Sequence, residues 1–182
     1  MADRLIRTAT ADLEVRGKDG RTLVGIAVPY DTPTDIRDYS GTYSEQFRFG
    51  AFERTIRERG DRIKLLSLHD RLKLPIGRAT LLREDTAGLY GEWRVSKTEA
   101  GDEVLELVRD GALDSFSIGF VPVRNVWSRD RSSVVRTEAK LLEVSVVALP
   151  AYETARIVGV RHNPRIIDAA TAERRLKLLD ME

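Results

Sequence analysis

Three residues of types that together can hydrolyse an amide or ester bond lie in or at the ends of predicted strands. They are His69, a strand serine that is either Ser115 or Ser117, and Glu143. A hydroxyl can attack a carbonyl, an imidazole can remove its proton, and a carboxylate can orient the ring and stabilise the imidazolium. The only other histidine is His162, so a histidine-dependent mechanism has almost no choice of base. The pattern fits a serine hydrolase, but its non-local spacing alone is not specific.

Strand alternation assigns these side chains to faces. In the segment 115–120, the small residues share one face and the apolar residues share the other: Ser115, Ser117 and Gly119 against Phe116, Ile118 and Phe120. In the segment 141–147, Glu143 and Ser145 share a face opposite Leu142, Val144 and Val146. A carboxylate in so apolar a strand costs free energy unless a partner satisfies it, so a partner for Glu143 is expected.

Each residue also has a structural interpretation. His69, followed by Asp70, could be a strand-end histidine in a turn. Ser115 and Ser117 could be solvated hydroxyls on the outer face of a barrel. Glu143 could pair with an arginine on a neighbouring strand. The candidates for that partner are Arg124 and Arg136. Together with Arg129 and Arg131, these two arginines are more typical of a solvated hairpin than of a groove that binds nucleic acid.

Composition excludes several other classes of site. The chain has 182 residues, a formal net charge of +1 and no cysteine, so no net field recruits nucleic acid or an anionic membrane, and thiol chemistry is absent. Neither a phosphate-cradling glycine motif nor the spacing of a calcium loop occurs. No spacing supports a metal site built from His69, Asp70 and Glu143. We therefore expect no metal and no cofactor.

Segments suited to a signal peptide or a membrane span are also missing. The first residues have no apolar core, and no stretch approaches the roughly 18 apolar residues that span a bilayer. The expectation is a soluble protein made in a cytosol, without a membrane partner.

The predicted elements are mostly short strands joined by turns. A capping box at 96–99 predicts a helix that ends at Gly111. A second helix is predicted at 51–59 and a third at 166–181, capped by Asn163. Residues 31–45, rich in Asp, Thr, Pro and Ser, read as a long loop. Strands are predicted within 12–30 (two), and at 63–68, 76–82, 89–95, 116–126, 134–136 and 141–149.

This order predicts a mainly β fold with peripheral helices, arranged as an antiparallel β-barrel or sandwich. Residues 1–160 would form the domain and residues 161–182 a helical tail. The tail could be an assembly helix or a helix packed on the domain.

An ordered set of motifs resembles the prohead (capsid maturation) proteases of tailed bacteriophages, whose fold is similar to that of the herpesvirus assemblins. The resemblance covers roughly residues 10–160 and rests on the whole set rather than on one motif. The matching stretches are 25–31 (Gly-Ile-Ala-Val-Pro-Tyr-Asp), 49–52 (Phe-Gly-Ala-Phe), 66–70 (Leu-Ser-Leu-His-Asp), 75–78 (Pro-Ile-Gly-Arg), 111–113 with 117–120 (Ser-Ile-Gly-Phe), and 142–147 with 150–151.

The resemblance implies a serine endopeptidase with Ser117 as nucleophile and His69 as general base. Ser117 is preferred to Ser115 because it precedes the Ile-Gly-Phe of the motif. Glu143 would be the third member. Assemblins place a second histidine on the equivalent strand, which His162 cannot supply because it lies outside that strand, and Asp70 is the alternative. Backbone amides would stabilise the oxyanion, with the segment 150–156 as the suggested source.

The implied substrate is the major capsid protein precursor or a scaffold segment, cut inside an assembling procapsid in the host cytoplasm. Because assemblins dimerise, the resemblance also makes a homodimer or a higher oligomer an expected partner state. Two other functions stay open at this point. One is a catalytically silent barrel that acts as a capsid-assembly scaffold module, and the other is a hydrolase of small esters or amides with the same fold.

Overall fold

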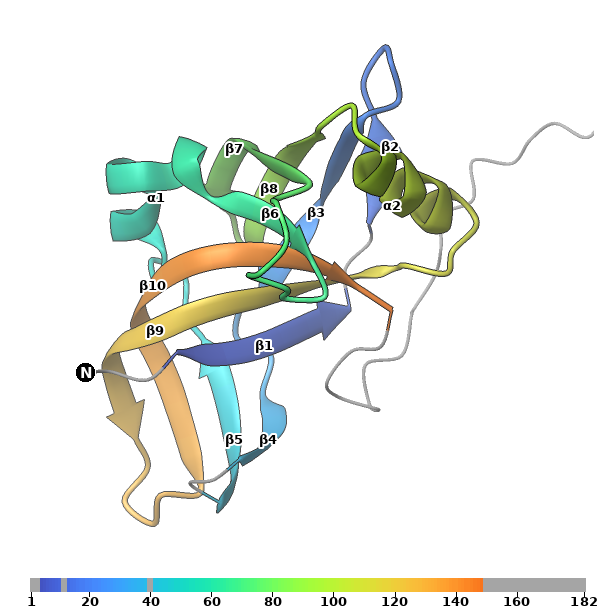
Figure 1. Cartoon of the computed structure of the whole chain (residues 1–182). Helices are drawn as coiled ribbons and strands as arrows, with labels where there is room; N and C mark the ends of the chain where they lie inside the picture. The colour runs from blue at the N-terminus through green and yellow to red at the C-terminus, as the bar shows by residue number, and fades with distance from the viewer. Residues whose placement is uncertain (1–3, 11–12, 39–40, 149–182) are drawn as a thin grey trace, which may run out of the picture.

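The computed structural model describes residues 4–10, 13–38 and 41–148. Within them, ten strands form one strongly curled sheet with the outline of a half-barrel, flanked by few helices (Figure 1). The strands are β1 (Leu5–Thr10), β2 (Glu14–Arg16), β3 (Thr22–Pro29), β4 (Thr34–Asp38), β5 (Gly41–Phe47), β6 (Lys64–Ser67), β7 (Gly77–Glu84), β8 (Gly88–Val95), β9 (Ser115–Trp127) and β10 (Ser133–Val147). The helices are α1 (Glu53–Arg59), the single 3₁₀ turn η1 (Gly60–Arg62) and α2 (Glu99–Arg109). The mainly β class expected from the sequence is confirmed.

The path through the sheet runs β1-β9-β10-β6-β7-β8-β3-β2, and β5 joins β10 with β4 beyond it. Most neighbours are antiparallel, as expected, but β5 and β6 both pair with β10 in parallel. The long strand β10 accommodates both, because β5 pairs with its first residues and β6 with its last. As a result, β9, β10 and the end of β6 lie side by side, which brings the three candidate residues onto adjacent strands.

The apolar face of β9 forms part of the main core. Phe116, Ile118 and Phe120 are fully buried. The ring of Phe116 packs against Trp93 of β8 with centroids 4.5 Å apart, and that of Phe120 packs edge-on against Phe47 of β5. This packing fixes which face of β9 points inward, and alternation then directs the side chain of Ser117 to the other face.

A β-bulge changes the expected pattern of β10. Its pairing with β9 shifts register between Leu141 and Glu143, so Leu141 joins the core whereas Leu142 is only partly buried. The prediction that Leu142 shares the inner face with Val144 and Val146 is therefore wrong. A bulge inserts one residue and breaks the two-residue alternation, which a pattern of apolar residues cannot reveal.

Helix α1 packs beside this bulge. The hydroxyl of Thr55 accepts a hydrogen bond from the amide of Leu141 at 3.2 Å and donates to the carbonyl of Ala139 at 3.4 Å. These contacts satisfy backbone groups that the irregular ladder exposes. The helix thereby holds the segment of β10 that leads into Glu143.

The loop expected over residues 31–45 is largely a hairpin of β4 and β5. Ile36 and Tyr43 pair across it and are buried with Val134, and Trp127 packs against them. The two strands could not be predicted from the sequence because most of their residues are polar. Only a few apolar side chains are buried, and they form a small cluster separate from the main core. Strand β1 was likewise not expected, because residues 5–10 show no clear alternation.

Helix α2 forms where predicted but begins differently. Its N-cap is Thr98, whose hydroxyl accepts a hydrogen bond from the amide of Gly101 at 3.2 Å. Ser96, the first residue of the predicted capping box, instead precedes the cap. The chain leaves the helix through Gly111 in a left-handed conformation at φ +83°, which glycine adopts without steric cost.

Several expectations fall on residues that the structure does not describe. They are the C-terminal end of the last predicted strand, the segment 150–156 suggested for the oxyanion, and the tail beyond residue 160 with its helix. Among the described helices, none is both long and apolar enough to cross a membrane.

Candidate active site

Three neighbouring strands carry the candidate residues to one point. Ser117 lies in β9 directly opposite Ser145 of β10, two residues from Glu143. His69 follows β6, whose Ser67 is paired with Val146 of β10. The sheet therefore brings together side chains that are 48 and 74 residues apart in the chain.

The imidazole of His69 lies between the other two side chains. Its Nε2 is 2.5 Å from Ser117 Oγ, and its Nδ1 is 2.8 Å from Glu143 Oε1. The chemically consistent tautomer carries the ring proton on Nδ1, where it is donated to the carboxylate, and leaves Nε2 free to accept the hydroxyl proton. Ser117 Oγ also lies 3.2 Å from the carbonyl oxygen of Arg7 in β1. The arrangement can hold and activate a serine nucleophile.

A sharp backbone turn aims the imidazole. Leu68 and His69 adopt φ values of +53° and +59°, a left-handed region that costs residues other than glycine about 1–3 kcal/mol each. Three hydrogen bonds hold the turn, from the amide of Leu68 to Val146 O, from that of His69 to Ser145 Oγ, and from that of Asp70 to Ser67 O. The strain is thus localised at the residue that contacts both Ser117 and Glu143.

The carboxylate of Glu143 is buried and fully engaged. Its Oε1 faces His69 and also accepts a hydrogen bond from the guanidinium of Arg4. Its Oε2 accepts one from the hydroxyl of Ser145 at 2.8 Å. Burial by itself raises the pKa of the Glu143 carboxyl, but the hydrogen bonds from His69, Ser145 and Arg4 and the charge of His69 together hold that pKa below its ordinary value. Glu143 is therefore ionised in the folded protein at neutral pH.

This lowered pKa predicts how stability depends on pH. A carboxyl that ionises more readily when folded stabilises the protein above its unfolded-state pKa of about 4.3, and the stabilisation is lost as pH falls towards the folded pKa. Between pH 6 and pH 3, the free energy of unfolding should therefore fall more steeply for the wild type than for Glu143→Gln. Urea titrations at a series of pH values would measure both slopes, and equal slopes would contradict the prediction.

Gly119 makes room for the carboxylate. It lies opposite Glu143 in the β9–β10 ladder, and a Cβ atom placed there would be 2.2 Å from Glu143 Oε1 and 2.6 Å from Arg4 Nη2. A side chain at position 119 would therefore force the carboxylate and the guanidinium to shift. The sequence pattern put Gly119 on the same face as Ser117, but only the structure shows which groups occupy the space beside it.

The rival residues lie elsewhere. The hydroxyl of Ser115 donates to Asp114 at 2.7 Å. Asp70 accepts from the amides of Leu72 and Lys73 and so stabilises the turn after His69. The structure brings neither into contact with the imidazole.

The expected arginine partners of Glu143 also have other roles. Arg124 pairs with Glu138, and Arg136 pairs with Glu45. Arg136 is buried rather than solvated, and Glu45 also binds Arg7 of β1. The partner of Glu143 is instead Arg4, which sequence reasoning missed, because the contact spans 139 residues.

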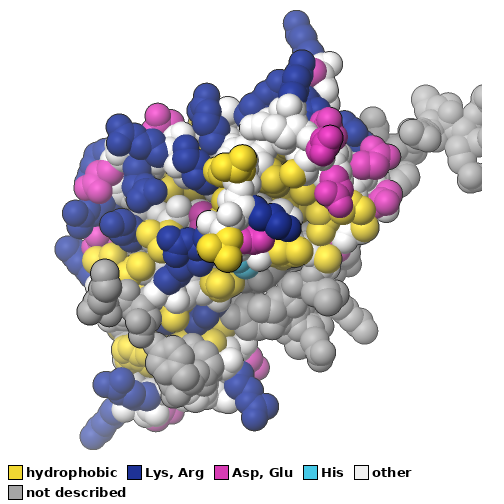
Figure 2. Space-filling view, in the orientation of Figure 1, with side chains coloured by type: hydrophobic (Ala, Val, Ile, Leu, Met, Phe, Trp, Pro, Cys, Tyr) yellow, Lys and Arg dark blue, Asp and Glu magenta, His cyan; other side chains and the backbone are white. Residues whose placement is uncertain are grey.

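Of the three candidate residues only His69 is partly exposed, with 15% of its side chain accessible, whereas Ser117 and Glu143 are buried. Figure 2 shows a small histidine-coloured area beside hydrophobic side chains on this face of the molecule. The exposed large apolar residues of the segment that follows β6 are Leu68, Leu72 and Leu74.

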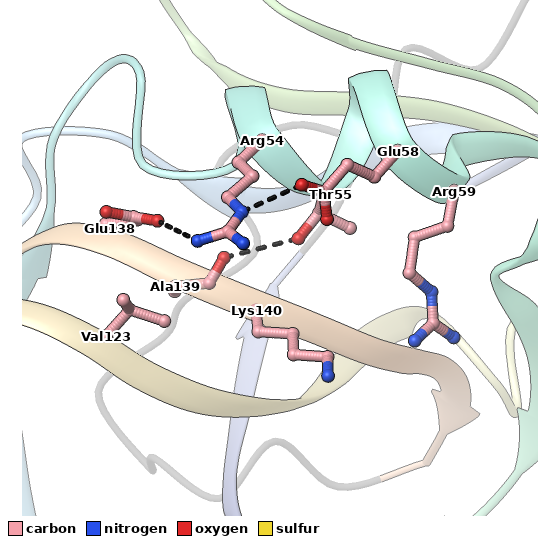
Figure 3. Close-up of a pocket in the computed structure, with 8 residues that line it drawn as sticks. All are labelled: Arg54, Thr55, Glu58, Arg59, Val123, Glu138, Ala139 and Lys140. Atoms are coloured by element: carbon pink, nitrogen blue, oxygen red, sulfur yellow. Dashed lines mark hydrogen bonds and ion pairs between the residues drawn. The ribbon is translucent and has the colours of Figure 1, made fainter.

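A pocket of about 130 Å³ lies between α1 and the sheet, away from the candidate site (Figure 3). Arg54 spans it, bonding to Glu58 and to Glu138. None of His69, Ser117 and Glu143 lines it. Among the residues that the structure describes, no group of three or more His, Asp or Glu side chains is placed to hold a metal ion.

Comparisons with known proteins give one consistent result. The sequence model of the family described as caudovirus prohead serine protease matches residues 9–166. The prohead protease of Enterobacteria phage HK97 is 25% identical over 114 residues, which are 62% of this chain and 51% of that protein. The chain thus spans about half the length of this curated relative.

A solved structure, that of the bacteriophage T4 capsid assembly protease, superimposes with a TM-score of 0.56 at 15% identity, covering 80% of this chain and 97% of the other. At that identity the likeness shows the fold alone. The family match, in contrast, runs through the sequence from β1 to beyond β10 and includes all three candidate residues. The chain therefore belongs to the caudovirus prohead serine protease family.

Proposed function

We propose that this protein is a serine endopeptidase that cleaves capsid or scaffold precursor proteins during procapsid maturation. Ser117 is the nucleophile, His69 the general base and Glu143 the third member of the triad. The observation that carries the proposal is the imidazole of His69 bridging Ser117 Oγ and Glu143 Oε1 in a chain of this family.

The geometry supports a two-step hydrolysis. Ser117 Oγ attacks the scissile carbonyl carbon while its proton passes to His69 Nε2. The ionised Glu143 stabilises the imidazolium through Nδ1. The imidazolium then protonates the leaving amine as the C–N bond breaks and an acyl-serine ester forms. Water, deprotonated by the same nitrogen, hydrolyses the ester and restores the hydroxyl of Ser117.

The family and the relatives suggest where this happens. A relative named prohead protease and a structural neighbour named capsid assembly protease support a capsid precursor as substrate. Cleavage would take place inside the assembling procapsid in the host cytoplasm, with the protease present as a homodimer or a higher oligomer.

The test is co-expression with a capsid precursor from the genome that encodes this protein, followed by intact-mass spectrometry of the products. Wild type should shorten the precursor at defined bonds, and Ser117→Ala should leave it whole. The new termini would give the cleavage specificity. If wild type left the precursor uncut although folded protein and assembled particles were present, the endopeptidase proposal would fail and a scaffold role would explain the data better.

A further inference from the structure

Arg4 occupies a position that the proposed mechanism does not use. It immediately precedes β1, whose Leu5 pairs with Phe120 of the nucleophile strand β9. From there its guanidinium reaches across Gly119 to Glu143 Oε1, the same oxygen that faces His69 Nδ1. Arg4 thus contacts the carboxylate on the same oxygen that faces the imidazole.

The surroundings of Arg4 are shaped to hold it. A Cβ at position 119 would lie 2.7 Å from Arg4 Nε, so a side chain there would displace the guanidinium as well as the carboxylate of Glu143. That Nε is buried without a hydrogen-bond partner. Leaving a buried N–H unpaired is unfavourable. The position of Arg4 therefore costs free energy that an arginine on the surface, whose N–H groups bind water, does not lose. A guanidinium placed only for solubility would not need this arrangement.

The charges around Glu143 come from two directions. His69 approaches from the end of β6 and Arg4 from the start of β1, while β9 contributes uncharged Gly119 and β10 contributes uncharged Ser145. Arg4 is therefore the permanent positive charge among the groups bonded to this carboxylate, whereas His69 carries charge only when protonated.

We propose that Arg4 is a positioning residue of the active site, which keeps the carboxylate of Glu143 ionised and oriented toward His69 Nδ1. This proposal rests on the proposed serine protease function. When the proton of Ser117 is on the imidazole, Glu143 must stabilise the imidazolium. A carboxylate that rotated away or became protonated could not do so.

The first experiment compares three variants with the wild type in the precursor cleavage assay. Arg4→Ala should lower kcat by about tenfold to a hundredfold, the loss expected for one charge-assisted hydrogen bond, with KM nearly unchanged. Arg4→Lys should recover part of the rate, and guanidinium ion added to Arg4→Ala should recover part of it too. Arg16→Ala is the matched control, because Arg16 pairs with Glu14 at an exposed site on β2, and it should cleave normally.

The second experiment asks whether Arg4 acts through Glu143. In a Glu143→Gln background, Arg4→Ala should cause little further loss, because residues acting as one unit are not additive. In the wild-type background, Arg4→Ala should move the acidic limb of the rate profile to higher pH, since Glu143 without the guanidinium protonates more readily. Thermal unfolding of every variant would separate these effects from misfolding.

Three results would overturn the inference while leaving the protease function in place. They are full activity of a folded Arg4→Ala variant, a fully additive loss in the Glu143→Gln background, or a rise in KM alone. A wild-type protein that cleaves nothing would instead overturn the proposed function itself.

Discussion

Ser117→Ala is expected to lower the rate of precursor cleavage by a factor on the order of 10⁴ or more, because no other hydroxyl lies within reach of His69 Nε2 among the described contacts. The variant should fold normally. Ser117 is fully buried, and losing its oxygen leaves only a small cavity. Its single hydroxyl proton is within reach of the imidazole and of the carbonyl of Arg7, and can be donated to only one of them at a time. Cleavage would be followed by intact mass, and folding by thermal unfolding.

Ser115→Ala is the matched control for this prediction. Ser115 lies two residues away on the same strand and is equally buried, but its hydroxyl donates to Asp114. Its replacement should leave cleavage nearly unchanged. A fluorophosphonate should modify wild type and Ser115→Ala at Ser117, as peptide mapping would show, and should leave Ser117→Ala unmodified. Loss of cleavage in Ser115→Ala with retention in Ser117→Ala would reverse the assignment of the nucleophile.

The strand patterns could mark the candidate residues, because each strand that carries one is recognisable by itself, but they could not show that these residues meet. The apolar side chains of β9 alternate with Ser115, Ser117 and Gly119, and tertiary packing keeps that alternation. Glu143 is conspicuous in the apolar strand β10, and burial there requires partners. The order of motifs then added the family fold, which composition and periodicity alone could not supply.

The arrangement of the strands was beyond the reach of these patterns. β6 and β10 run parallel and are joined by a long stretch of chain, so their adjacency depends on the whole sheet rather than on a local turn. The same holds for β1, which carries Arg4 and lies beside β9 although more than a hundred residues separate them. Arginine is usually a surface residue, and nothing local marks Arg4 or Arg136 as an inward-facing partner of a carboxylate.

The turn at His69 was unpredictable for a different reason. Left-handed backbone is normally signalled by glycine or asparagine, whereas here Leu68 and His69 adopt it in succession. Hydrogen bonds to β10 impose the conformation, among them the one from His69 N to Ser145 Oγ. Ser145 therefore orients both the backbone of His69 and the carboxylate of Glu143, a double role that strand alternation cannot indicate.

Gly119→Ala is expected to lower cleavage by about 10²-fold or more although it adds a single methyl group. The new Cβ would lie 2.2 Å from Glu143 Oε1. The backbone at position 119 cannot retreat easily, because β9 is paired on one side with Ile6 of β1 and on the other with Glu143 of β10. The carboxylate must therefore move by about an ångström, and misplacement on that scale costs about 10² in rate. The initial rate of precursor cleavage would measure the loss.

The control and a second measurement locate the cause of that loss. Gly60→Ala should cleave at the wild-type rate, because Gly60 has helical backbone angles and a Cβ there would meet only Ile56 at an ordinary 3.8 Å. In Gly119→Ala, the rate of fluorophosphonate labelling of Ser117 should fall together with cleavage, since Glu143 acts on the nucleophile through His69 rather than on the substrate. Normal labelling with impaired cleavage would point to substrate binding instead. Normal cleavage by a folded Gly119→Ala protein would mean that the carboxylate has room to move without consequence, and that its contact with His69 is not needed for catalysis.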